Sequence, residues 1–316
     1  MVKEEFYFDS HDGKQKLHAV RYSPEKGQKV RCVLQIVHGM AEYAERYEEF
    51  AGFLTGKGYA VTGEDHLGHG KSVGKEGKYG YFCEEDPASA LVENVHTLRK
   101  RTESLYQGVP YVIMGHSMGS FITRNYLFRH GEGLAGAVIM GTGMESLATV
   151  KLAQTVARVQ RLVQGSRKES RLIDRMAFGG YNKIVGGPRG GWDWLSRDRD
   201  SVARYMADPL CGFVFTVNGF ETLFELIARL YDRKSLERIP KTLPVFMVSG
   251  DADPVGACGK GVRKAYDSLV KAGLEHVELK IYEGGRHELL NEINRKEVME
   301  DISSWIESTV RGIGEC

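Results

Sequence analysis

Short apolar runs alternate with longer stretches of helical periodicity along most of this chain. The apolar runs are rich in Val, Ile, Leu and aromatic residues and cover residues 32–37, 59–63, 111–114, 135–140, 245–248 and 277–282. Stretches with apolar residues three and four positions apart cover residues 46–57, 88–106, 118–129, 259–272 and 296–310. Strands that alternate with amphipathic helices form a mostly parallel sheet with helices on both faces. The pattern therefore predicts an α/β fold.

The beginning of the chain departs from this alternation. Residues 5–8 and 17–22 are strand-like, and His11-Asp12-Gly13-Lys14 between them is a turn signal. Two strands joined by a short turn pair antiparallel. We therefore expect an N-terminal antiparallel hairpin at one edge of the sheet.

A second departure lies between Gly141 and about Arg238, where the strand-like runs stop. Helical periodicity recurs at residues 147–163 and 220–231, and no strand-like run separates these two stretches. A chain of 316 residues is long for one compact domain, and one α/β domain with an insertion accounts for that length. We predict an α/β core formed by residues 1–143 and 239–316, and a helical cap, or lid, formed by residues 144–238.

The charges of the chain nearly balance. There are 43 Lys and Arg against 42 Asp and Glu, so no overall field draws the chain to nucleic acid or to anionic membranes. The first ten residues lack the composition of a signal peptide, and no run reaches the roughly 20 apolar residues of a membrane span. The five cysteines include no C-x-x-C pair. These features predict a cytoplasmic protein without a disulfide framework, a zinc site or an integral membrane segment.

A short motif stands where one apolar run meets a helical stretch. Gly115-His116-Ser117-Met118-Gly119 fits G-x-S-x-G, in which a tight strand-to-helix turn exposes a nucleophilic serine. The motif is short enough to occur by chance, so its surroundings matter. A buried-strand run at 111–114 precedes it and a helical stretch at 121–128 follows it, as this turn requires. We predict that Ser117 is a nucleophile.

A serine hydroxyl needs a base that accepts its proton. In folds with this turn the chain order is serine, acid, histidine, which leaves His276 and His287 as candidates. His276 precedes the strand-like run 277–282, whereas His287 follows it. Catalytic groups of open α/β sheets lie at the carboxyl ends of the strands. The sequence therefore indicates His287 as the base.

Two aspartates follow the strand-like run 245–248 at the same edge of the predicted sheet. In Gly250-Asp251-Ala252-Asp253-Pro254, either carboxylate can orient the imidazole of His287. Asp251 can instead close the turn through hydrogen bonds to the nearby backbone. The residues alone leave both aspartates open as candidates for the acid.

Backbone N–H groups are expected to bind the oxyanion of a tetrahedral intermediate. One belongs to the residue after the nucleophile, Met118, and the other to the loop after the run 32–37, at Met40. His38 and His116 lie near this site, and we interpret them as braces of the loops rather than proton carriers. We interpret residues 65–72, in another loop at this edge, as structural.

Together these motifs resemble the monoacylglycerol lipase and lysophospholipase group of α/β-hydrolases, which is also filed with serine aminopeptidase-like hydrolases. The resemblance covers most of the chain and lies in His38-Gly39-Met40-Ala41-Glu42 with Arg46-Tyr47, and in residues 65–70, 115–119, 250–255 and 282–288. Residues 194–198 and 208–213 resemble bacterial members in particular. Met40, Ala41 and Tyr43 depart from the eukaryotic lipases, which usually have Ala, Gly and His at these positions.

The resemblance implies that the second aspartate, Asp253, completes a triad with Ser117 and His287. It implies hydrolysis of a small-molecule acyl ester, expected to be a single-chain lipid, through an acyl-enzyme, with no more than transient contact with lipid surfaces. Such a mechanism requires no metal and no organic cofactor. A small-ester carboxylesterase or a peptide amidase on the same triad is the alternative. A hydrolase-like protein that binds a ligand without turnover is less favoured, because the serine, histidine and aspartates are all present.

The predicted cap carries two apolar faces. The first comprises Leu147, Leu152, Val156, Val159, Leu162 and Val163, and the second Phe213, Phe215, Phe220, Leu223, Phe224, Leu226 and Ile227. The cap follows the strand-like run 135–140 directly, so the chain leaves the core at the edge where the serine is expected. We expect the cap to cover Ser117 and to form an apolar tunnel for an acyl chain.

Overall fold

The structure, a computed structural model, describes residues 1–75, 77–188 and 191–311. These residues form an eight-stranded sheet in the order β1-β2-β4-β3-β5-β6-β7-β8. The strands are β1 (Val2–Asp9), β2 (Lys16–Ser23), β3 (Cys32–Val37), β4 (Tyr59–Glu64), β5 (Tyr111–His116), β6 (Gly136–Met140), β7 (Val245–Gly250) and β8 (Val277–Tyr282). β1 and β4 both pair antiparallel with β2, and the other neighbours pair in parallel. The predicted α/β fold and its N-terminal hairpin are confirmed.

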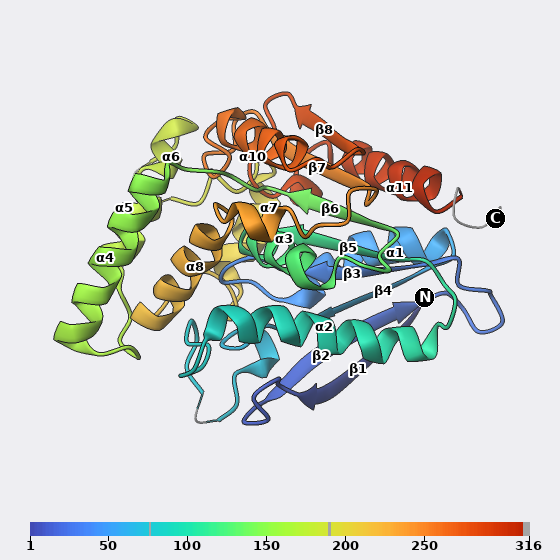
Figure 1. The fold of residues 1–316 in the computed structure, drawn as a ribbon, viewed down its shortest axis with the longest axis horizontal. Coiled ribbons are helices and arrows are strands. Elements are labelled where there is room, and N and C mark those ends of the chain that lie inside the picture. The colour runs from blue at the N-terminus through green and yellow to red at the C-terminus, as the bar shows by residue number, and fades with distance from the viewer. Residues whose placement is uncertain (76, 189–190, 312–316) are drawn as a thin grey trace.

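Helices cover both faces of this sheet (Figure 1). The helices α1 (Glu48–Gly56) and α11 (Arg295–Arg311) pack on one face, and α2 (Pro87–Leu105), α3 (Met118–His130) and α10 (Lys260–Lys271) pack on the other. Alternate side chains of each strand point to opposite faces. In β5, Val112 and Met114 accordingly join the core under α1 and α11, whereas Ile113 joins the core under α2 and α3.

The helices begin and end within a few residues of the predicted positions. The stretch 46–57 starts earlier than expected, with a short 3₁₀ turn, η1 (Ala44–Tyr47), that leads into α1. The stretch 259–272 starts one residue later, because Gly259 has φ +86 and so lies outside the right-handed helix. Further 3₁₀ turns are η2 (Gly70–Ser72) and η3 (Leu289–Asn291).

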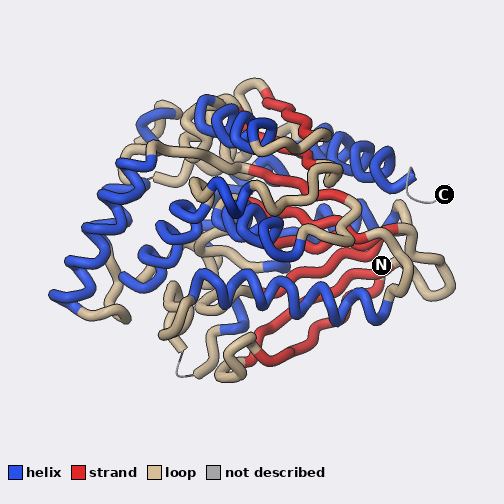
Figure 2. The backbone as a smooth tube through the Cα atoms, viewed as in Figure 1, coloured by secondary structure: helices blue, strands red, loops and turns tan. Residues whose placement is uncertain are grey.

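The residues between β6 and β7, which we call the β6–β7 segment (residues 144–238), contain helices joined by loops (Figure 2). They are α4 (Leu147–Gln164), α5 (Arg171–Phe178), α6 (Tyr181–Ile184), α7 (Arg199–Ala207), α8 (Val217–Arg229) and α9 (Arg233–Leu236). α4 packs on α8, and these are the two helices that periodicity predicts. The other four are too short for a repeating apolar pattern to show. No described helix is long and apolar enough to cross a membrane.

The contact between α3 and β3 generates a test of the fold. A methyl group at Gly119 would lie 1.9 Å from the carbonyl oxygen of Val37, whereas one at Gly56 would meet no atom within 4 Å. Gly119→Ala is expected to lower the free energy of unfolding by about 1–3 kcal/mol, because the helix must move from the strand. Gly56→Ala, the control, should raise it by about 0.5–1 kcal/mol. Equal effects in urea unfolding would contradict this close approach.

Candidate active site

Ser117 occupies the sharp turn between β5 and α3. Its backbone has φ +54 and ψ −121, a conformation that residues other than glycine rarely adopt, and its N–H donates to the carbonyl oxygen of Met140 at 3.0 Å. A side chain at Gly115 would collide with the backbone of Gly119. The two glycines of the motif therefore allow α3 to pass close behind the serine, whose side chain is partly exposed to a cavity.

His287 and Asp253 form a buried pair in the loops after β8 and β7. The Nδ1 atom of His287 lies 3.0 and 3.1 Å from the two carboxylate oxygens of Asp253. A carboxylate only accepts hydrogen bonds, so this contact places the imidazole proton on Nδ1 and leaves Nε2 as an acceptor. His287 lines the same cavity as Ser117. The structure describes both Ser117 and His287 and contains no hydrogen bond between them, so transfer of the serine proton to Nε2 requires the two side chains to approach each other.

The structure separates the two candidate acids. Asp251 is exposed, and its side chain accepts a hydrogen bond from the N–H of Gly284 at 2.6 Å, which closes the turn against the next loop. Asp253 is fully buried and contacts His287. His276 is exposed at the beginning of β8, at the opposite end of the strand from His287.

In the loop after β3, the backbone N–H groups on both sides of Met40 are bound to side chains. The N–H of Gly39 donates to Glu42 Oε1 at 2.5 Å, and the N–H of Ala41 donates to His69 Nε2 at 3.2 Å. Among the described residues, no acceptor binds the N–H of Met40 or that of Met118. Both methionines line the cavity beside Ser117. The two predicted oxyanion donors are therefore unpaired and adjacent to the serine.

A buried charge network lies behind this site. Glu42 accepts from Tyr47 Oη at 2.9 Å and lies 3.1 Å from His116 Nδ1, while its second oxygen binds Arg46 at 2.6 Å. Arg46 also binds both carboxylate oxygens of Glu288, at 2.7 and 2.8 Å. Sequence reasoning missed this network, because no local pattern pairs Arg46 with a residue 242 positions away.

The charges of this network are fixed by its contacts. Burial favours the neutral form of His116, but the hydrogen bond and the charge of Glu42 raise its pKa above the ordinary value. Burial likewise disfavours the Glu42 carboxylate, yet His116 and Arg46 hold its pKa well below the ordinary value. The Nε2 atom of His116 lies 3.2 Å from the carbonyl oxygen of His287 and therefore carries a proton. His116 thus braces the His287 loop, as its interpretation as a brace predicts.

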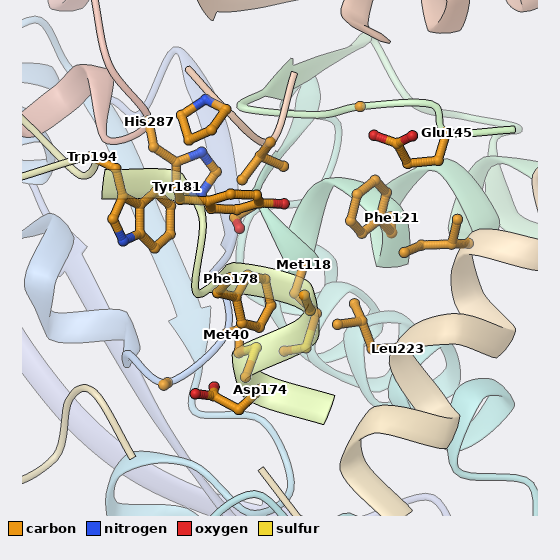
Figure 3. Close-up of a pocket in the computed structure, with 18 of the residues that line it drawn as sticks. Met40, Met118, Phe121, Glu145, Asp174, Phe178, Tyr181, Trp194, Leu223 and His287 are labelled. Carbon is orange, nitrogen blue, oxygen red and sulfur yellow. The ribbon is translucent and has the colours of Figure 1, made fainter. Parts of the chain in front are cut away.

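The cavity has a volume of about 640 Å³ and lies between the sheet edge and the β6–β7 segment. His287, Trp194 and Tyr181 lie together at one side, and Phe121 and Leu223 at the other (Figure 3). The residues of the two predicted apolar faces that line it are Leu152, Val156, Phe213, Leu223, Phe224 and Ile227.

The other residues of those faces lie elsewhere, which corrects the predicted tunnel. Phe215, Phe220 and Leu226 are buried in the main core. The second half of α4 extends past the cavity, so Val159, Leu162 and Val163 are 55%, 87% and 81% exposed. Leu147, at the start of α4, is also exposed. Helical periodicity identifies a shared face but not how far along a helix its partner reaches.

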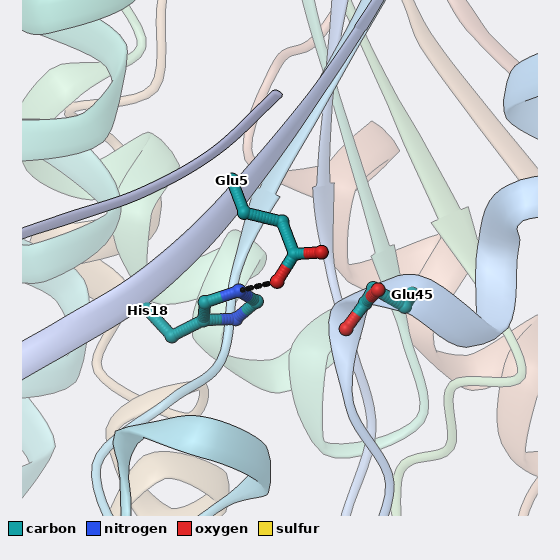
Figure 4. Close-up of side chains that lie close together, drawn as sticks. All are labelled: Glu5, His18 and Glu45. Carbon is teal, nitrogen blue, oxygen red and sulfur yellow. Dashed lines mark hydrogen bonds and ion pairs between the residues drawn. The ribbon is translucent and has the colours of Figure 1, made fainter. Parts of the chain in front are cut away.

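Glu5, His18 and Glu45 place possible metal ligands close together, away from the cavity (Figure 4). The ammonium group of Lys71 lies 2.6 Å from Glu5 Oε2 and 2.7 Å from Glu45 Oε2, so a cation already balances these carboxylates. His18 Nδ1 lies 2.9 Å from the buried Asp65. This cluster ties the N-terminal hairpin to the loop after β4, and we assign it a structural role.

Comparison with known proteins agrees with this geometry. The model of the family described as "Serine aminopeptidase, S33" matches residues 28–294. The chain belongs to the serine aminopeptidase S33 family. Within it, the chain is 29% identical to a monoacylglycerol lipase of Mycolicibacterium smegmatis, over 88% of this chain and 89% of the relative. It is 27% identical to the monoglyceride lipase of Homo sapiens, over 87% of this chain and 82% of the relative.

A solved structure supports the same classification of this S33 family member. The thermostable carboxyl esterase of Bacillus coagulans, crystallised in complex with glycerol, is 32% identical, with a TM-score of 0.89 over 98% of this chain and 99% of the esterase. The S33 family member is thus an α/β-hydrolase, similar to monoacylglycerol lipases and esterases. The predicted resemblance and the predicted hydrolase class are confirmed.

The two aspartates provide a test of the site. Asp253→Asn should reduce kcat on the order of 10⁴-fold, because an amide does not fix the proton on His287 Nδ1 or stabilise the imidazolium. Asp251→Asn is the matched control and should change kcat less than about tenfold, since it alters a turn that remains closed by the backbone. Steady-state kinetics with a chromogenic ester measure both. A larger loss in Asp251→Asn would show that the acid is misassigned.

Proposed function

We propose that this protein is a serine carboxylic ester hydrolase whose substrates are single-chain acyl esters such as monoacylglycerols. The observation that carries the proposal is the shared cavity. It brings Ser117, in a strained turn, beside two unpaired N–H groups and the His287–Asp253 pair. Each of these features has a separate role in acyl transfer.

In the proposed reaction, Ser117 Oγ attacks the ester carbonyl while Nε2 of His287 takes the hydroxyl proton. The N–H groups of Met40 and Met118 bind the oxyanion, and Asp253 stabilises the imidazolium. The ester C–O bond then breaks, and His287 protonates the leaving alkoxide, which departs as the alcohol. Water, deprotonated by His287, releases the acid from the acyl-enzyme by the same steps.

We further propose that the β6–β7 segment acts as a cap that selects the acyl group. Apolar side chains of α4 and α8 form much of the cavity wall. The named activities of the relatives, monoacylglycerol lipase and carboxyl esterase, support esters with one acyl chain. A cavity of this size, with a largely apolar lining, accepts one acyl chain.

One observation favours a second function, cleavage of an amide next to a free amino group. Asp174 and Met40 both line the cavity (Figure 3), and no described side chain pairs with the carboxylate of Asp174. Burial raises the pKa of its carboxyl group. A substrate ammonium would neutralise this carboxylate, as an aminopeptidase-like reaction requires. Aminoacyl amides therefore belong in the same hydrolysis assay as the esters.

Removal of the nucleophile or the base tests the proposed reaction. Ser117→Ala and His287→Ala are each expected to reduce kcat by at least about 10⁴-fold with the fold retained, because the three groups act as a unit. A fluorophosphonate probe should label the wild-type protein and not Ser117→Ala. Retention of about one tenth of the wild-type activity in either variant is incompatible with the assignment.

Acyl-chain length tests the cavity. Each buried methylene contributes about 0.8 kcal/mol, so kcat/KM for monoacylglycerols should rise about fourfold per methylene from C4 to at least C8. Leu223→Trp and Leu152→Asp alter the cavity wall and should flatten this rise. Leu162 lies on α4, like Leu152, but away from the cavity, so Leu162→Asp is the control and should preserve the rise in kcat/KM. A flat wild-type profile would favour a small-ester esterase instead.

A further inference from the structure

We propose that His69 is a positioning residue that fixes the direction of the Met40 N–H group, a role that rests on the proposed function. His69 lies just before η2, in the loop after β4, within the segment 65–72 that sequence reasoning interprets as structural. Its side chain is fully buried and faces the loop after β3. The geometry of this contact between His69 and the loop after β3 indicates more than packing of two loops against each other.

A buried histidine holds each of the two peptide groups that flank Met40. Nδ1 of His38 donates to the carbonyl oxygen of Gly39 at 2.8 Å, which fixes the Gly39–Met40 peptide. Nε2 of His69 accepts from the N–H of Ala41 at 3.2 Å, which fixes the Met40–Ala41 peptide. A peptide group is planar, with its N–H and C=O pointing in opposite directions. The N–H of Met40 belongs to the first of these peptides and points away from the Gly39 carbonyl that His38 holds. His69 holds the second peptide, so the two contacts together prevent rotation about Met40 and keep its N–H in one direction.

Ala41 needs such a contact, because its conformation is unfavourable. It has φ +53, in the left-handed region, where the Cβ atom of an alanine crowds the backbone. Its carbonyl oxygen accepts from the N–H of Gly212 at 3.0 Å and from Tyr205 Oη at 3.2 Å, both in the β6–β7 segment. Ala41 is thus held by His69 from the core and by two residues of the β6–β7 segment from the other side.

The role requires that His69 stays neutral, and its surroundings ensure this. Nδ1 lies 2.9 Å from the carbonyl oxygen of Leu67, which can only accept, so the proton resides there and Nε2 keeps its lone pair. Burial lowers the pKa of His69 to about 3. The rings of Phe82, Phe213 and Phe215 pack around the imidazole, with centroids 5.2 to 5.7 Å away. They exclude the water that would otherwise replace the contact with Ala41.

His69→Phe tests the inference, because phenylalanine keeps an aromatic ring in this site and removes the acceptor. We expect kcat to fall about tenfold to a hundredfold with KM changed less than about threefold, since a misplaced oxyanion donor acts on the transition state. Phe50→Leu, in the core under α1 and away from His69, is the packing control: it should lower the melting temperature and leave kcat within about twofold. Wild-type kcat in a folded His69→Phe variant would overturn the proposal.

A rescue experiment separates positioning from simple packing. Glycine adopts the left-handed conformation without cost, so Ala41→Gly, added to His69→Phe, should raise kcat at least about threefold above that of His69→Phe alone. No recovery would overturn the role of the Ala41 conformation. If His69→Phe does not fold, Tyr205→Phe removes another hydrogen bond to Ala41. It should lower kcat at unchanged KM, and an unchanged kcat would again overturn the proposal.

A spectroscopic measurement is independent of turnover. In ¹⁵N-histidine NMR spectra of the wild-type protein, His69 should remain the neutral Nδ1–H tautomer from about pH 5 to about pH 9. Protonation within that range would overturn the proposal. A wild-type protein without ester turnover or probe labelling would instead contradict the proposed function, so the two failures are distinguishable.

Discussion

The arrangement of the loops around the candidate site depends on the interactions of one buried group, the carboxylate of Glu42. Its oxygens bind the backbone of the loop after β3, the histidine that ends β5, and Arg46, which in turn binds Glu288 after β8. Three loops from distant parts of the sequence are thereby joined through one buried group. Burying these charges contributes little net stability compared with an apolar core, but removing one partner costs about 3–5 kcal/mol. The network therefore specifies one arrangement of the loops.

The sheet supplies the frame for this network. β3, β5, β6, β7 and β8 run parallel, so their carboxyl ends meet at one edge and their loops converge there. The β6–β7 segment closes the same edge. The N–H groups of His287 and Glu288 donate to the carbonyl oxygens of Trp194 and Leu195, and Ala41 accepts from Gly212. Parts of the segment are therefore integral to the site, whereas the second half of α4 projects into solvent with apolar side chains exposed.

Much of the fold and the residues of the candidate site could be predicted from the sequence, because the signals are local. Ser117 lies in a motif whose glycines are needed for a turn of two or three residues. Short apolar runs indicate the strands. The two aspartates were not separable on physical grounds, since both follow β7 within three residues. Only the fold shows that Asp251 accepts a hydrogen bond from Gly284, whereas Asp253 contacts His287.

The sequence by itself determined the alternation of strands and helices and the turn that holds Ser117, because each depends on neighbouring residues. Tertiary structure alone decided which residues of the β6–β7 segment face the cavity and how Arg46 pairs with Glu288. It also decided that His69 contacts Ala41, 28 residues away. These contacts join elements that are distant in the chain. Burial then makes each of them specific, because a polar group removed from water must find one particular partner.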